Sequence, residues 1–155
     1  MANSSGVANS FKFECMMGYH QLGAPTLVSR TSLTAPTNDV VKAALYLSSA
    51  TTGPSNTVYT VTGEVSGTGY TAGGVTVTNA TAPNLQTTTG VWDASADIVF
   101  TSTASIGPTD CVMLYNSTQG NRNIAVYTFA AQTFNGTLTL TRPAIGAATS
   151  MLRIA

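Results

Sequence analysis

Polar and apolar residues alternate strictly in two stretches of the chain, Thr137-Leu138-Thr139-Leu140-Thr141 and Val75-Thr76-Val77-Thr78. A period of two places successive side chains on opposite faces of a β-strand, so that one face is buried and the other meets water. The buried faces of such strands must pack against a second layer. The alternation therefore predicts a layered, all-β domain.

Other short runs are rich in β-branched or aromatic residues and are bounded by Gly, Pro, Asn or Ser/Thr clusters. With the two alternating stretches they predict eight strands, at residues 40–47, 58–61, 75–77, 97–101, 111–115, 123–129, 137–141 and 151–154. Turn residues lie between some of them, at Gly107-Pro108, Asn116-Ser117 and Asn135-Gly136. This pattern predicts a β-sandwich or jelly-roll-like domain over residues 40–155.

The first 39 residues have a different character. Residues 1–9 are small and polar and read as an extended arm, whereas residues 23–39 hold two prolines and read as an extended excursion. Between them Ser10 is a suitable N-cap, and Gly23 and Pro25 end an apolar pattern with spacings of three and four. The residues of that pattern are Phe11, Cys15, Met16, Tyr19 and Leu22. One short N-terminal helix is therefore expected.

Composition excludes several functions. Charged residues make up only 8% of the 155 residues, and six Lys plus Arg balance six Asp plus Glu. The chain therefore has no basic patch that would displace counterions from phosphates, and no apolar stretch long enough to span a bilayer. Hydroxyl groups take the place of charge, because the chain holds 27 Thr and 14 Ser. We expect neither a nucleic acid nor a membrane as partner.

Few residues offer catalytic or metal-binding chemistry. His20 is the only histidine, and we interpret it as a hydrogen-bonded structural residue near the end of the helix instead of a base or a ligand. Asp93 and Asp97 would lie about 13 Å apart along a strand, which is too far for an acid–base pair. We read Asp110 as a turn residue. No catalytic, cofactor-binding or metal-binding residue is expected, and the protein is not expected to be an enzyme.

The two cysteines, Cys15 and Cys111, lie outside any Cys-x-x-Cys spacing. We therefore expect reduced, buried thiols, and pairing between them is left open.

The glycine-rich run at residues 63–74 contains neither a Gly-x-Gly-x-x-Gly nor a P-loop pattern. This run predicts a tight connection with several positive φ angles, in which Tyr70 is the large side chain available as an anchor.

Seven segments together resemble a group of small virion structural proteins of tailed bacteriophages. They are residues 19–23, 41–46, 64–74, 96–100, 114–116, 125–129 and 152–155, and the most specific is Ser-Gly-Thr-Gly-Tyr-Thr-Ala-Gly-Gly at 66–74. Residues 24–40 depart from that group, in which the first strand follows the helix almost directly. The resemblance implies a non-enzymatic component of the shell or of an appendage. Our leading hypothesis is a capsid cement or decoration protein that contacts several capsid subunits.

Two alternatives remain open. The same resemblance fits a tail, neck or fibre-base component of a virion. A carbohydrate-binding adhesin module would instead need an exposed aromatic platform, for which Trp92, Tyr59, Tyr70 and Tyr127 are the available residues, unless they fill the core.

The cement hypothesis fixes the expected partners. These are the major capsid protein of the same virion and further copies of this chain on the particle. Residues 1–11 show no secretory signal, so we expect synthesis in the host bacterial cytoplasm and assembly into the virion. Residues 1–9 and 24–39 are expected to become ordered on neighbouring subunits. The expected partner-binding residues are Val7, Phe11, Leu27, Val28, Leu33 and Tyr70.

Overall fold

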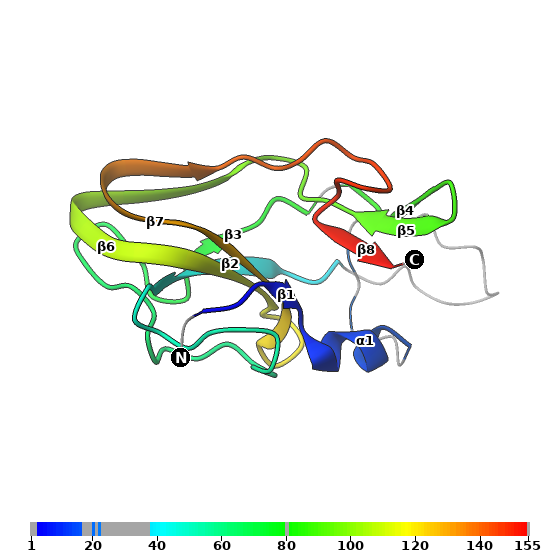
Figure 1. The fold of residues 1–155 in the computed structure, drawn as a ribbon, viewed down its shortest axis with the longest axis horizontal. Coiled ribbons are helices and arrows are strands. Elements are labelled where there is room, and N and C mark those ends of the chain that lie inside the picture. Colours follow the sequence, from blue (N-terminus) through cyan, green and yellow to red (C-terminus); the bar gives the residue numbers. More distant parts are fainter. Residues whose placement is uncertain (1–2, 17–19, 21, 23–37, 80, 155) are drawn as a thin grey trace.

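The computed structural model describes residues 3–16, 20, 22, 38–79 and 81–154 (Figure 1). Within them the chain is almost entirely β, with one short helix, α1 (Asn9–Met16). The strands are β1 (Gly6–Val7), β2 (Val41–Leu47), β3 (Val75–Thr76), β4 (Asn84–Gln86), β5 (Thr89–Trp92), β6 (Ile98–Asn116), β7 (Arg122–Leu140) and β8 (Leu152–Ile154). They form two antiparallel sheets, ordered β1-β7-β6-β2-β3 and β4-β5-β8. The predicted all-β, sandwich-like class is confirmed.

The fold is built around one long two-stranded ribbon. β6 and β7 are each 19 residues long, and they pair from Ile98 opposite Leu140 to Asn116 opposite Arg122. The register shifts three times between Ser102 and Cys111, and such bulges bend and twist a strand. Figure 1 shows the ribbon turning back over itself.

The bend brings the two halves of the ribbon together around one core. Ile98 and Phe100 in the first half of β6 belong to the same buried cluster as Val112 and Leu114 in the second half. The same cluster connects the three-stranded sheet to the ribbon, because Trp92 of β5 is only 3% exposed and packs within the cluster. The two layers that the alternating sequences predicted therefore come largely from a single folded ribbon.

The predicted strands at residues 40–47, 75–77 and 151–154 are confirmed to within one residue as β2, β3 and β8. The predicted breaks at Gly107-Pro108 and Asn135-Gly136 are wrong, because both dipeptides lie inside β6 and β7. Gly107 and Gly136 adopt φ angles of 123° and 96° within the bent ribbon, and strand pairing continues on both sides of them. Only Asn116-Ser117 begins a true connection, the turn between β6 and β7.

The strand predicted at residues 58–61 is also wrong. Its backbone forms one isolated bridge, between Val58 and Arg122, and the Tyr59 amide donates to the Asn121 carbonyl (2.8 Å). Other contacts run through side chains, such as the hydrogen bond from the Tyr46 hydroxyl to the Thr60 carbonyl (2.7 Å). Conversely, β1, β4 and β5 were not among the predicted strands. β4 and β5 are joined through Thr87, whose φ of 58° is unusual for a residue other than glycine.

The N-terminal segment lies against the chain's own sheet. β1 pairs with Val126 and Ala125 of β7, and Ala8 is completely buried. Asn3 Nδ2 donates to Asp110 Oδ1 (2.5 Å) and to the Leu47 carbonyl (3.1 Å). This differs from the expected arm that orders on a neighbouring subunit, because an unpaired part of the β7 edge and a carboxylate are available within the chain. α1 ends at Met16, and Leu22, where its apolar pattern was expected to close, lies buried in the core.

None of the helices in the described part of the chain is long and apolar enough to cross a membrane.

The close approach at Gly74 gives a test of the fold. Gly74 has a φ of +71°, and a Cβ built there would overlap the carbonyl oxygen of Ala43 in β2. Gly120 has a similar φ of +65° with no atom within 4 Å. We expect Gly120→Ala to cost about 1 kcal/mol from the left-handed backbone alone, and Gly74→Ala to cost at least about 3 kcal/mol because β2 must also move. Urea unfolding of both variants checks this, and equal losses would contradict the packing at Gly74.

Candidate functional site

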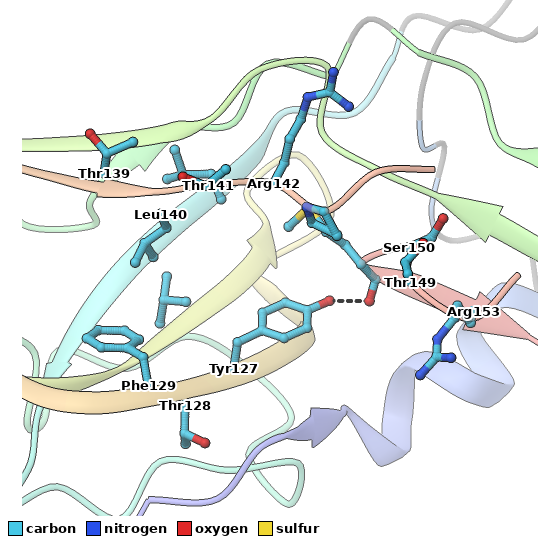
Figure 2. A pocket seen from close by; sticks show the side chains of 14 residues that line it. Tyr127, Thr128, Phe129, Thr139, Leu140, Thr141, Arg142, Thr149, Ser150 and Arg153 are labelled. Carbon is cyan, nitrogen blue, oxygen red and sulfur yellow. Dashed lines mark hydrogen bonds between the residues drawn. The ribbon is translucent and has the colours of Figure 1, made fainter. Parts of the chain in front are cut away.

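A groove of about 490 Å³ opens between the two halves of the bent ribbon (Figure 2). We call it the β7 groove. Its apolar lining comes from Ile98, Val112, Tyr127, Phe129, Leu140, Pro143 and Met151. Its hydroxyl lining comes from Thr128, Thr139, Thr141, Thr149 and Ser150, and its charged lining from Arg142 and Arg153.

Strand pairing places the apolar side chains. Val112 pairs with Tyr127 in one half of the ribbon, and Ile98 pairs with Leu140 in the other half. Directly paired residues of antiparallel strands share a face, so each half contributes a cross-strand pair to the groove. Phe129 lies two residues beyond Tyr127 on the same strand and extends this apolar wall. In Figure 2, Leu140 on one half lies opposite Phe129 and Tyr127 on the other.

Tyr127 joins this wall to the segment before β8. Its hydroxyl donates a hydrogen bond to the Met151 carbonyl (2.5 Å), shown as the dashed line in Figure 2. Burial raises the pKa of Tyr127 above its ordinary value of 10.0, and the charge of Asp93 raises it further, whereas Arg153 lowers it. Tyr127 is therefore a neutral hydrogen-bonding residue at neutral pH. It is half-buried and forms part of the groove wall.

The groove concentrates positive charge in a chain that has little charge. Two of the six basic residues line it, and no carboxylate does. Arg153 Nη1 donates to the Ala148 carbonyl (2.8 Å). The described residues offer no acceptor to the Arg142 guanidinium, although its backbone amide donates to Asp97 Oδ1 (2.9 Å). The groove thus combines an apolar surface, hydroxyl groups and guanidinium groups, which suits binding.

Asp93 lies close behind the groove and is only 2% exposed. Its Oδ1 atom accepts a hydrogen bond from the Met151 amide (2.6 Å), so it fixes the chain opposite Tyr127. Its Oδ2 atom is buried and has no hydrogen-bond partner among the described residues. Asp93 therefore supports the segment that carries part of the lining.

The glycine-rich run is held by a second polar cluster, centred on Glu64. Its Oε1 atom accepts hydrogen bonds from the Tyr70 hydroxyl (2.8 Å) and the Gly73 amide (2.7 Å), and its Oε2 atom accepts from the Tyr59 hydroxyl (2.5 Å). The Tyr70 hydroxyl also accepts from the Leu45 amide (3.0 Å). The predicted anchoring role of Tyr70 is confirmed. Positive φ angles are confirmed as well, at Gly63, Gly67, Gly69, Gly73 and Gly74.

Three tyrosines besides Tyr70 surround this carboxylate. The Tyr59 and Tyr115 rings stack with centroids 4.6 Å apart, and the Tyr115 hydroxyl donates to the Gly73 carbonyl (2.7 Å). The Tyr46 hydroxyl donates to the Thr60 carbonyl (2.7 Å). Burial raises the pKa of all four tyrosines, and the negative charge of Glu64 acts in the same direction. Sequence analysis missed Glu64, whose one signal was a carboxylate within a glycine-rich run of a charge-poor chain.

His20 takes part in a third cluster. Its Nδ1 atom lies 3.1 Å from Asn116 Nδ2, and its ring is 4.7 Å from that of Phe11. Asn116 Nδ2 also donates to Asp39 Oδ2 (2.6 Å), and Gln119 Nε2 donates to Asp39 Oδ1 (3.2 Å). The interpretation of His20 as a hydrogen-bonded structural residue is confirmed. The cluster ties it to the β6–β7 turn.

Three of the predicted partner-binding residues, Val7, Phe11 and Tyr70, lie in the described part of the chain. Phe11 is 2% exposed and belongs to the core, whereas Val7 and Tyr70 are half-buried at separate places. Leu27, Val28 and Leu33 lie outside the described residues, so their role stays a prediction. Of the residues considered for an exposed aromatic platform, Trp92 is buried and its Nε1 atom donates to Asn79 Oδ1 (3.2 Å).

The remaining sulfur and carboxylate groups serve the fold. Cys15 and Cys111 are not joined by a disulfide, and burial, with a smaller effect of Asp110, raises the pKa of Cys111 to about 12. Among the described residues, no group of three or more His, Cys, Asp or Glu side chains could hold a metal ion. Five carboxylates accept hydrogen bonds from donors of the chain itself: Asp39, Glu64, Asp93, Asp97 and Asp110.

Comparison of the chain with protein-family models, with curated proteins and with solved structures gives no match.

The buried tyrosines predict a loss of stability at alkaline pH. Their folded pKa values lie above the unfolded value of 10.0, so the folded state keeps protons that the unfolded state releases. The free energy of unfolding should therefore be level near neutral pH and fall above about pH 10, by up to about 1.4 kcal/mol per pH unit for each such tyrosine. Cys111 adds a contribution of the same sign.

Urea unfolding between about pH 8 and pH 11.5 measures this dependence, which covers the range where the unfolded tyrosines ionise. Tyr70→Phe is the matched control, because it removes one titrating group and should give a shallower slope along with lower stability at neutral pH. Stability that stays level up to the highest pH would contradict the buried, neutral state of these hydroxyls.

Proposed function

We propose that this protein is a non-enzymatic virion structural protein, and specifically a capsid cement or decoration protein that contacts several copies of the major capsid protein. The resemblance to small phage virion proteins supports this proposal through residues 64–74, the segment now seen as the loop anchored by Glu64 and Tyr70. The physical observation that carries the proposal is the composition of the described surface. Hydroxyl and apolar side chains predominate on it, and the described carboxylates accept hydrogen bonds from the chain itself.

Such a surface suits attachment to a repeating shell. Burial of apolar groups and hydrogen bonds between neutral groups are screened by salt far less than exposed ion pairs are. Large exposed apolar side chains occur at several separate places, among them Val61 (69% exposed), Leu85 (68%) and Ile154 (62%). One copy would therefore contact more than one neighbour, and many weak contacts on a lattice combine into strong attachment.

A tail, neck or fibre-base component is the second candidate, because the resemblance concerns virions in general. Copy number separates the two locations. Quantitative mass spectrometry of purified particles should find hundreds of copies per particle for a shell component, and at most a few dozen for a tail component. Absence of the chain from purified particles would overturn both. A carbohydrate-binding role receives less support, since Trp92 is buried.

Salt dependence tests the mode of attachment. If uncharged contacts dominate, most copies should stay on the particle when purified virions are moved from low salt to about 1 M NaCl, where ionic screening acts over only about 3 Å. Sedimentation of the particles followed by protein gels measures the retained fraction. Release of most copies at high salt would mean that ion pairs hold the chain.

A further inference from the structure

The outer edge of β7 is largely without a strand partner among the described residues. β6 pairs with one side of β7 along its length, whereas the other side is covered only from Arg122 to Val126, by β1 and by backbone bonds from Ala8 and from residues 57–58. Just beyond this point the Thr128 amide donates to the hydroxyl oxygen of Ser5 (2.7 Å). The strand continues to Leu140 with no second neighbour. An edge of this kind offers backbone groups to an added strand.

The β7 groove lies along this edge. Tyr127 and Phe129 line it from one half of β7 and Leu140 lines it from the other half. These are inward-facing side chains that the chain's own core covers only in part. An extended segment that pairs with the edge would alternate its side chains, so that every second one points into the groove.

Charge complementarity indicates what that segment carries. Arg142 and Arg153 line the groove and no carboxylate does. Arg153 donates to the Ala148 carbonyl, whereas among the described residues Arg142 donates only through its backbone amide, to Asp97. Arginine pairs with carboxylates through two parallel hydrogen bonds, which also fixes orientation. In Figure 2 the two guanidinium groups point to opposite sides, so an otherwise apolar segment with an acidic side chain toward each of them matches the groove.

We propose that the β7 edge and groove accept an extended segment of a neighbouring capsid subunit, with apolar residues at alternate positions and separate acidic side chains for Arg142 and Arg153, whose guanidinium groups point to opposite sides in Figure 2. The inference rests on the proposed function, since it names the partner from it. The added segment completes the sandwich where the bent ribbon leaves it open. The partner's apolar side chains supply the salt-resistant part of binding. The two arginines fix the position of the added segment along β7.

Arginine replacement tests the recognition step. Full-length protein is titrated onto purified capsids that lack it, as wild type and as the double variant R142Q/R153Q. We expect the double variant to bind about tenfold more weakly, as for other charge pairs that lose one partner. We also expect it to lose the modest dependence of wild-type affinity on salt. Arg122→Gln, at the β6–β7 turn, removes the same charge outside the groove and should bind as wild type does.

Circular dichroism and thermal melting establish that each variant is folded. The single variant R142Q keeps the test valid if the double variant is unstable, because none of the described residues accepts a hydrogen bond from the Arg142 guanidinium. A photo-crosslinking residue at Thr128 should then capture one segment of the capsid subunit, identified by peptide mapping, and a crosslinker at the exposed Val61 should not capture that segment.

The outcomes separate the two proposals. Wild-type protein that fails to bind capsids at all overturns the proposed function. Normal binding of R142Q/R153Q, or a Thr128 adduct with a second copy of this chain, overturns the groove inference and leaves the cement function standing. Weakened binding of the double variant together with a capsid adduct at Thr128 supports both.

Discussion

The antiparallel pairing of β6 with β7 is the interaction on which the rest of the structure depends. A flat ribbon of this length would leave one apolar face in water, and the bulges between Ser102 and Cys111 remove that cost by folding the ribbon onto itself. β2 and β1 then extend the sheet on its two sides, and the small sheet joins through Trp92 and the Tyr127–Met151 hydrogen bond. The bend therefore provides both the core and the open edge beside the groove.

Most of the few carboxylates of this chain hold its loops in place through hydrogen bonds. The chain has six acidic residues, and the five whose side chains are described all accept hydrogen bonds: Asp39, Asp93, Asp97 and Asp110 from segments distant in sequence, and Glu64 within its own loop region. Glu64 alone joins two tyrosine hydroxyls and a backbone amide. Charge-assisted hydrogen bonds are stronger than neutral ones, so few ions suffice.

Local features were predictable from the sequence. The alternation at residues 137–141 fixed a strand with one buried face, and Tyr70 was the only large side chain able to anchor the glycine-rich loop. Turns were wrongly predicted at Gly107-Pro108 and Asn135-Gly136, because residues typical of turns instead lie within continuous, bent strands there. The signal for a turn is local, whereas the decision to continue pairing depends on a partner strand some thirty residues away.

The candidate site could not be predicted from the sequence, because it too depends on contacts between residues that are distant in the chain. Tyr127 and Leu140 lie on opposite halves of one strand, and only the bend places them on the two walls of a groove. Arg142 and Arg153 belong to no sequence motif. They indicate a binding site only because both line a groove that no carboxylate lines. Apart from Tyr70, the expected partner residues were apolar positions of the N-terminal segment, of which Phe11 belongs to the chain's own core.

A high-resolution reconstruction of the intact virion tests the central claim most directly. The account predicts density for the bent β6–β7 ribbon at many symmetry-related positions on the shell, with an extended capsid segment beside β7. A fully interpreted particle without this chain, or a chain whose only contacts in the particle are ion pairs, would contradict it.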